Sequence, residues 1–306
     1  MIGIISYLPD DLAVRKKRTA SIEKQIRWIR SVLGNEPIIV CAQNYKTGDY
    51  SHDSAVEYVN FSSGIGPARA RNEILKRFYR SGDSCLLLLD DDNTMYPYYD
   101  YEELFKNLYY QFDNFGDIDF VCCVDPAREA FKATLFNNQY SKDYYILKRA
   151  SINCCPNVMF LRNFSKFGKP QIFYDDSYVV GKDPEAFSED LDFVSQLIVG
   201  GNKCYQCLNF IKRPLAYANS TLFSKQENQT SHSKLIVKFA DRWSSRGIKY
   251  DGKLNTSEFM RRYNLADSFK YIKQSKRYSF PDNLIPDGNE AVYATTPRSL
   301  WEKKNV

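Results

Sequence analysis

Three consecutive aspartates, Asp90, Asp91 and Asp92, follow the apolar stretch at residues 85–89. Adjacent carboxylates repel one another, and no Lys or Arg stands close to them in the sequence, so an offsetting cation is expected. Mg²⁺ or Mn²⁺ can provide that charge, since proteins usually hold these ions through one or two carboxylates together with substrate phosphates. The pattern predicts a metal and diphosphate site. An ordinary acidic loop after a strand is the alternative.

A second acidic group, Glu189 and Asp190 with Asp192 close by, lies about a hundred residues further along the chain. A carboxylate within hydrogen-bond reach of an acceptor hydroxyl can take its proton as a general base. The same residues, with Ser188 before them, also suit the positive end of a helix dipole. A catalytic role and a capping role are both compatible with this pattern.

Two arginines, Arg69 and Arg71, follow the Gly-containing loop at residues 62–67. Guanidinium groups bind phosphate and sugar oxygens through paired hydrogen bonds. These side chains are therefore candidates for contacts with a phosphorylated ligand.

The hydrophobic pattern indicates which elements position these residues. It predicts strands at 2–8, 37–42, 56–61, 85–89, 119–124, 157–161 and 204–211, and helices at 19–33, 68–79, 184–199, 235–243 and 257–263. Alternation of strands and helices is typical of an α/β fold with a mainly parallel sheet. Such sheets bind ligands at the carboxyl ends of their strands, so we expect the three aspartates at that edge.

Charge divides the chain unequally. Residues 234–306 carry 15 Lys and Arg against 8 Asp and Glu, whereas residues 1–233 carry 27 against 29. We therefore predict a catalytic domain at 1–233 and a basic, aromatic-bearing helical extension at 234–306. The extension, with Trp243 among its aromatic residues, is either a polyanion-binding surface or a solvated helical face. The candidate cations for binding DNA are Arg261, Arg262, Lys273 and Lys276.

Composition excludes several classes of protein. Hydrophobic residues make up 43% and charged residues 26%, which indicates a globular chain. No apolar run is long enough to span a bilayer, and no signal peptide is evident, so we expect no transmembrane anchor. The eight cysteines lie mostly in apolar runs typical of buried thiols; Cys204 and Cys207 are the one pair with a zinc or redox spacing.

The segment GIGPARARNEILKRFYRSGDSCLLLLDDDNTM resembles the nucleotide-sugar core of GT-A-type glycosyltransferases. Arg71 and Asn72 match that family's Ala-Arg-Asn element, and Asp90 and Asp92 match its Asp-x-Asp motif. The resemblance implies a GT-A-type, Rossmann-like sheet flanked by helices. It also implies that Asp90 recognises the ribose or uracil side of the donor and that Asp92 binds the metal. Asp91, Arg69, Arg71 and Asn72 join the candidate donor-binding residues.

The resemblance extends to about residue 235. It implies that one carboxylate of the Glu189-Asp190 pair is the general base of an inverting enzyme, and Asp190 is preferred. It further implies that His232 is a metal ligand, although a single His is more often an ordinary surface or core residue. Lys234 beside it is placed to meet the leaving diphosphate.

The function predicted is a glycosyltransferase, hexosyl or pentosyl and inverting, that depends on Mn²⁺ or Mg²⁺ and uses a UDP-sugar. Its acceptor is predicted to be a hydroxyl of a hydroxymethylated or already glycosylated cytosine in double-stranded phage DNA. The predicted location is the cytoplasm, which is the host cytoplasm if a phage encodes the protein. A surface glycan or lipid-linked sugar is the alternative acceptor. A nucleotidyltransferase and a non-catalytic DNA-binding module are the alternative functions.

Overall fold

The computed structural model describes most of residues 1–265, together with a short strand at 269–273. The described ranges are 1–49, 53–91, 93–95, 118–124, 144–150, 158–178, 188–214, 226–265 and 269–273, with the single positions or short groups 106, 108–110, 112 and 152. Asp92 and Lys276 lie outside the described residues, and of His232 and Lys273 only the backbone is described.

Four parallel strands and two helices form the N-terminal part of the chain, which ends at Asp90. They are β1 (Ile2–Tyr7), α1 (Leu12–Leu33), β2 (Ile38–Gln43), β3 (Val56–Asn60), α2 (Pro67–Ser81) and β4 (Cys85–Asp90). In the sheet these strands stand in the order β3-β2-β1-β4, and each neighbouring pair is parallel. Their carboxyl ends therefore meet at one edge of the sheet, where β4 ends in Asp90.

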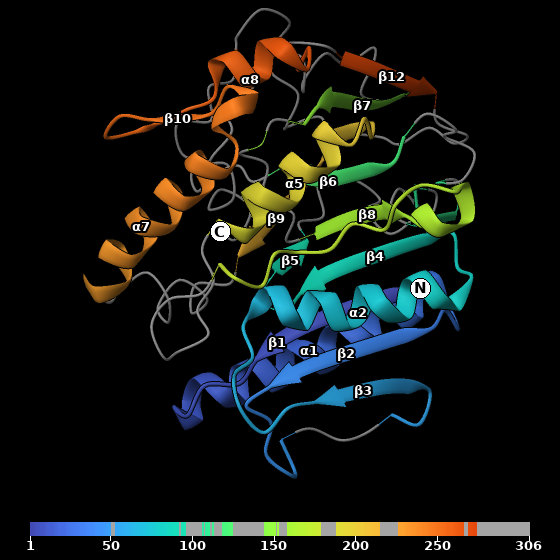
Figure 1. Ribbon diagram of the computed structural model, residues 1–306. Helices are drawn as coiled ribbons and strands as arrows, with labels where there is room; N and C mark the ends of the chain where they lie inside the picture. Colours follow the sequence, from blue (N-terminus) through green and yellow to red (C-terminus); the bar gives the residue numbers. More distant parts are fainter. Residues whose placement is uncertain are drawn as a thin grey trace, which may run out of the picture.

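The strands that follow Asp90 extend the same sheet. They are β5 (Asn93–Met95), β6 (Phe120–Val124), β7 (Tyr144–Arg149), β8 (Val158–Arg162), β9 (Cys204–Pro214) and β12 (Phe269–Lys273). The order is β12-β7-β9-β6-β8-β4-β1-β2-β3, with β5 paired to β9 off this path, and β8 runs antiparallel to both β4 and β6. The predicted α/β fold with flanking helices is confirmed, with parallel pairing concentrated among β1 to β4 (Figure 1).

The helices α1 and α2 begin where local capping directs them. The predicted helix at 19–33 begins earlier, at Leu12, because the Asp11 carboxylate accepts hydrogen bonds from the backbone N–H groups of Ala13 and Val14, both at 2.9 Å. Helix α2 begins at Pro67, whose fixed φ and missing N–H suit the first turn.

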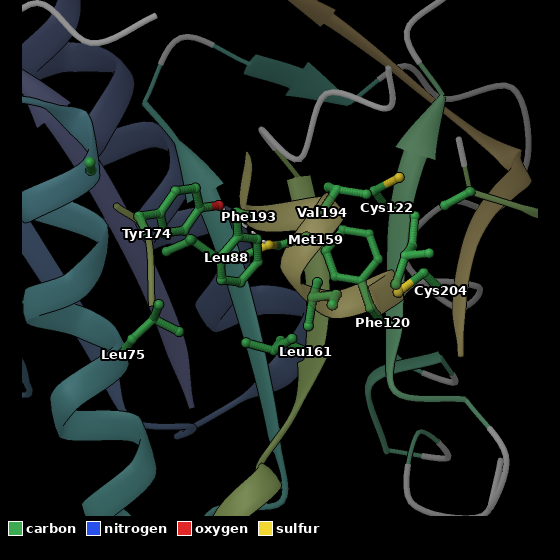
Figure 2. Packing of buried hydrophobic residues seen from close by; sticks show 14 of the residues in the cluster. Leu75, Leu88, Phe120, Cys122, Met159, Leu161, Tyr174, Phe193, Val194 and Cys204 are labelled. Carbon is green, nitrogen blue, oxygen red and sulfur yellow. Dashed lines mark hydrogen bonds between the residues drawn. The ribbon is translucent and has the colours of Figure 1, made fainter. Parts of the chain in front are cut away.

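The sheet separates two hydrophobic cores. Leu86 and Leu88 of β4 pack with α2, whereas Leu87 and Leu89 pack on the face covered by α1, as strand alternation requires. Figure 2 shows the α2 side, where Leu88 lies near Tyr174 and Phe193. Residues that follow one another at the end of β4 should therefore diverge toward different helices.

The later helices and short strands pack on the α2 side of the sheet or close to it. They are the one-turn helix η3 (Phe164–Phe167), α5 (Glu189–Val199), α7 (Gln226–Arg242), η4 (Ser244–Arg246), the hairpin β10 (Lys249–Tyr250) and β11 (Leu254–Asn255), and α8 (Ser257–Arg262). The predicted boundary at 233/234 falls inside α7. Phe239, Trp243 and Phe259 are buried in the same core as α2 and α5. The described part of the basic segment therefore packs as part of the same fold.

Trp243 corrects one expectation about that segment. It is 9% exposed, and its indole Nε1–H donates to Asp192 Oδ1 at 2.8 Å. A buried and hydrogen-bonded indole cannot stack on a ligand at the surface. Trp243 therefore belongs neither to a polyanion-binding surface nor to a solvated helical face, the two alternatives considered for this segment.

Cys41, Cys85, Cys122, Cys204 and Cys207 are buried and form no disulfide. Cys204 packs in the α2-side core and Cys207 in the α1-side core, on opposite faces of β9. The zinc or redox alternative for this pair is thus excluded by geometry, and the buried-thiol interpretation is confirmed. Within the described residues, no helix combines the length and apolar character that crossing a membrane requires.

Candidate active site

Arg71 joins the two acidic groups found in the sequence. It lies in α2, its side chain is 4% exposed, and its Nη2 lies 3.2 Å from Asp90 Oδ1 at the end of β4. Its Nη1 lies 3.1 Å from both Glu189 Oε1 and Asp190 Oδ1 at the start of α5. The structure therefore brings together residues that lie 19, 118 and 119 positions from Arg71 along the chain.

Arginine side chains lie close to two of the three consecutive aspartates, which corrects the expectation that a metal ion must offset their charge. No Lys or Arg lies near the three aspartates in the sequence, but in space Arg71 faces Asp90, and Arg18 Nη1 lies 2.7 Å from Asp91 Oδ1. Repulsion among the carboxylates is thus offset for Asp90 and Asp91 by arginines from two helices. A metal ion is not needed for that purpose.

Asp91 does not face the same way as Asp90. It is 2% exposed, and its two carboxylate oxygens accept hydrogen bonds from Arg18 and from Ser6 Oγ, the latter at 2.5 Å. Burial raises the pKa of Asp91, while Arg18 and the Ser6 hydrogen bond oppose that rise. The expectation that Asp91 contacts the donor is corrected: its carboxylate is used inside the fold, on the α1 side of the sheet.

The charges around Arg71 distinguish Glu189 from Asp190. Burial alone would lower the pKa of Arg71, but Asp190 and Asp90 hold it well above its ordinary value. Burial raises the pKa of Glu189, the neighbouring Asp190 raises it further, and Arg71 opposes both effects. Glu189 is 7% exposed and Asp190 is 21% exposed. Asp190 is therefore the carboxylate of the pair that an acceptor can reach more readily.

Asp192 is a structural carboxylate. It is fully buried and receives hydrogen bonds from Trp243 Nε1 at 2.8 Å, Gln196 Nε2 at 2.8 Å and the Tyr178 hydroxyl at 3.3 Å. Arg242 Nε lies 3.2 Å from it. With its oxygens engaged in this way, Asp192 ties α5 to α7 and is not placed to act as a base.

The start of α5 differs from the capping interpretation in one respect. Ser188 makes no side-chain hydrogen bond to the helix, and it has φ +68°, which is left-handed backbone that few non-glycine residues adopt. Strained backbone of this kind often occurs at functional sites. The acidic residues Glu189, Asp190 and Asp192 in the first turn still suit the helix dipole.

Asn72 and Arg69, two further donor-binding candidates, make contacts within the protein. The Asn72 side chain donates to Tyr174 O and accepts from Tyr174 N, both at 2.9 Å. Through these two hydrogen bonds Asn72 holds that segment against α2, and a contact of Asn72 with the donor stays a prediction. Arg69 is 60% exposed and forms an ion pair with Asp176 at 3.0 Å.

The remaining candidates lie on the basic part of the chain. Lys234 is exposed on α7, two residues after the helical position of His232. On α8, Arg261 is exposed, whereas Arg262 pairs with Glu258 at 3.0 Å and donates to Ser245 O at 2.7 Å. Arg261 is thus better placed than Arg262 to meet a polyanion.

A divalent cation fits the donor chemistry of this edge. Among the described residues no group of three or more His, Cys, Asp or Glu side chains is placed to hold a metal ion. Mg²⁺ and Mn²⁺ sites at phosphates nevertheless often use only one or two protein carboxylates. Asp90, which is 16% exposed at the carboxyl end of β4, is suitable as one of these, and Asp92 is two residues on in the sequence.

Comparisons with known proteins give only distant structural likenesses. No protein-family model matches the chain, and no curated protein does. GalNAc-T7 solved with UDP, GalNAc and Mn²⁺ is 11% identical, with a TM-score of 0.44 over 87% of this chain and 54% of that one. Residues 1–349 of TarS from S. aureus, solved with UDP-GlcNAc, are 11% identical, with a TM-score of 0.41 over 85% and 79%. A197 from STIV is 15% identical, with a TM-score of 0.34 over 70% and 84%. At TM-scores below 0.5, none of these likenesses assigns an activity to this chain.

Proposed function

We propose that this chain is an inverting glycosyltransferase that moves a sugar, hexosyl or pentosyl, from a nucleotide-sugar donor to an acceptor hydroxyl. The observation that carries the proposal is the set of ion pairs by which Arg71 connects Asp90 with Glu189 and Asp190, here called the Arg71 bridge. It sets Asp90, a candidate donor and metal residue, beside Asp190, a candidate base, at the carboxyl edge of the parallel strands. Glycosyl transfer needs these two functions next to each other, one at the diphosphate and one at the acceptor.

The chemistry follows from these placements. Asp190 takes the proton of the acceptor hydroxyl, the acceptor oxygen forms a bond to C1 of the sugar, and the bond from C1 to the diphosphate oxygen breaks. The leaving nucleoside diphosphate, UDP in our proposal, carries the electron pair away, and a single displacement inverts C1. Asp90 and Asp92 would hold Mg²⁺ or Mn²⁺, with His232 as a further candidate ligand, and this ion supplies positive charge to the departing diphosphate.

Arg71 has a different role from the donor contact expected for it. Its guanidinium is buried and paired with three carboxylates, so it holds the two acidic groups at a fixed separation. Pairing with Arg71 also offsets part of the repulsion between Glu189 and Asp190. Arg69 and Lys234, both exposed, are the cations we propose for the diphosphate.

The first experiment tests donor turnover. UDP-sugars are incubated with the full chain in Mn²⁺ or Mg²⁺, and released UDP is measured for the unmodified protein and for Asp90→Asn. This substitution keeps an oxygen that can accept from Arg71 but removes the carboxylate charge. We expect metal-stimulated turnover in the unmodified protein and its loss in Asp90→Asn.

The matched control is Asp251→Asn, in the exposed turn between β10 and β11, which should turn over donor normally. Normal metal-dependent turnover in Asp90→Asn would contradict the assignment of Asp90. Formation of a nucleotide sugar from a nucleoside triphosphate and a sugar phosphate would instead establish the nucleotidyltransferase alternative.

For the acceptor we propose a hydroxymethylated or already glycosylated cytosine in double-stranded DNA. The support is the set of exposed cations on α8 and on the segment between α7 and α8, which includes Arg246 and Arg261. Lys and Arg contacts to phosphates supply most of the affinity in non-specific DNA binding. Transfer of labelled sugar to duplex DNA with hydroxymethylcytosine, compared with unmodified duplex, tests this. Transfer only to a glycan or a lipid-linked sugar would contradict it.

A further inference from the structure

Three polar residues on α1 contact the backbone or side chain of the Asp90–Asp91 pair. Arg18 Nη1 donates to Asp91 Oδ1 at 2.7 Å, Ser21 Oγ donates to Asp91 O at 2.5 Å, and Gln25 Nε2 donates to Asp90 O at 3.0 Å. Their spacing of three and four residues places them on one face of the helix. A single face of α1 is therefore directed at the tip of β4.

Asp91 is held from the strand side as well. Its backbone N–H donates to Ile5 O on β1 at 3.0 Å, and its second carboxylate oxygen accepts from Ser6 Oγ. With the α1 contacts, the N–H, the C=O and both carboxylate oxygens of this residue are all bonded. Few rotations remain open to the backbone at this point.

Core packing alone does not account for these contacts. The apolar face of α1 already buries Ile22, Ile26 and Ile29 against the sheet. A buried ion pair such as Arg18–Asp91 loses the hydration of both charges, and apolar residues of similar volume are often as stabilising. What the polar contacts add is a fixed conformation of the chain where β4 ends.

That conformation determines where Asp90 points. Side chains alternate along a strand, so holding Asp91 toward α1 turns Asp90 toward Arg71 on α2. A misplacement of about 1 Å in a reacting group can cost about a hundredfold in rate. The geometry of the acidic tip therefore depends on α1 as well as on Arg71.

We propose that Arg18, Ser21 and Gln25 are positioning residues, which fix the end of β4 so that Asp90 meets the donor and its metal ion in one geometry. This inference rests on the proposed function. It gives Gln25 a role that its place in the sequence, far from any catalytic motif, does not indicate.

The test uses Ser21→Ala combined with Gln25→Met, because removing Arg18 would leave Asp91 buried without its partner and would endanger folding. The matched control is Ser31→Ala, also on α1, whose hydroxyl donates to Trp28 O one turn earlier in the same helix. Donor kcat and KM, Mn²⁺ affinity by calorimetry and the thermal midpoint are measured for each protein.

We expect the double variant to unfold near the temperature of the control while its kcat falls by about tenfold or more and its Mn²⁺ affinity weakens, with a smaller change in KM. Ser21→Thr combined with the natural Gln25 should retain the rate, since it keeps the hydroxyl. Unchanged kcat and Mn²⁺ affinity in the double variant would overturn the inference, as would a loss that merely follows the thermal midpoint. Absence of donor turnover in the unmodified protein would instead contradict the proposed function, and this inference would fall with it.

Discussion

Arg71 is the residue on which the arrangement of the acidic side chains depends, because its buried guanidinium contacts Asp90, Glu189 and Asp190. Asp90 and Arg71 were both expected near a phosphorylated ligand, and the structure places them in contact with each other. Their link to Glu189 and Asp190 could not be predicted, because it joins segments separated by more than a hundred positions. The opposite orientation of Asp91 could have been predicted, since neighbouring residues of a strand face opposite sides.

Replacement of Asp190 tests the base at this scale. Asp190→Asn should lower kcat for transfer by about 10² to 10⁴-fold, because a general base acts in the transition state. UDP affinity, measured by calorimetry, should change much less. Asp241→Asn, exposed on α7, is the matched control and should leave both quantities unchanged. Parallel losses of rate and UDP affinity would show that Asp190 binds the donor.

Replacement of Arg71 tests the bridge itself. Arg71→Met leaves the buried Glu189 and the partly buried Asp90 and Asp190 without their cation, and loss of one partner of a buried ion pair costs about 3–5 kcal/mol. Urea unfolding measures this change in the free energy of unfolding. Arg69→Met, two residues away on the same helix, removes only an exposed pair with Asp176 and should cost about 0–1 kcal/mol. Similar losses in both variants would contradict the role assigned to Arg71.

Among the elements, most predicted strands agree with the structure within one or two residues, but β9 continues to Pro214, beyond the predicted end at residue 211, and β7 and β12 were not predicted. The run at 85–89 becomes β4, and the Gly-Pro boundary at 66–67 begins α2 as expected. The early start of α1 was missed, although Asp11 is a recognisable capping residue. The antiparallel direction of β8 had no local signal, because strand direction depends on how the chain connects the strands.

The contact between β1 and α2 provides a test of element packing. A Cβ added at Gly3 would lie 2.5 Å from Ile74 Cγ2 and 3.0 Å from Leu88 Cδ1. Gly3→Ala should therefore overpack this layer and lower the free energy of unfolding by about 1–3 kcal/mol. If the clash is the cause, Ile74→Ala in the same chain should relieve it, so that the double variant loses less than the sum of the two single losses. Additive losses in urea unfolding would show that the two positions are not coupled.

For the whole molecule, charge counting predicted a separate basic extension from residue 234, whereas its described part up to Leu265 packs in the α2-side core. Leu235, Phe239 and Trp243 recur every four residues and form a buried helical face, a signal that the charges obscured. Some cations of this segment are also used internally: Lys238 Nζ donates to Ser177 O at 2.7 Å, and Arg242 pairs with Asp175. Net charge therefore overstates the number of cations that a polyanion can meet.

The salt dependence of DNA binding tests which cations remain available. If the basic segment binds duplex DNA, the logarithm of the binding constant should fall linearly as the logarithm of the salt concentration rises. The slope should be about −0.9 for each phosphate contacted. Reversing Arg261 and Lys276 to Glu should make this slope shallower by about two contacts and raise the KM for DNA. Arg262 is left unchanged because its side chain bonds to Ser245 O and Glu258.

Lys166→Glu, on the exposed turn after β8, is the matched control, since it changes net charge by the same sign outside the basic segment. Donor hydrolysis without acceptor should be the same in all these proteins, because none of the substituted residues belongs to the proposed donor site.

If Lys166→Glu and the double reversal weaken the affinity for duplex DNA equally, the loss is a general effect of net charge. A slope near zero for the unmodified protein, with turnover on a small soluble acceptor unaffected by the reversals, would exclude DNA as the acceptor. The core built on Asp90, Arg71 and Asp190 would then act on a glycan or a lipid-linked sugar.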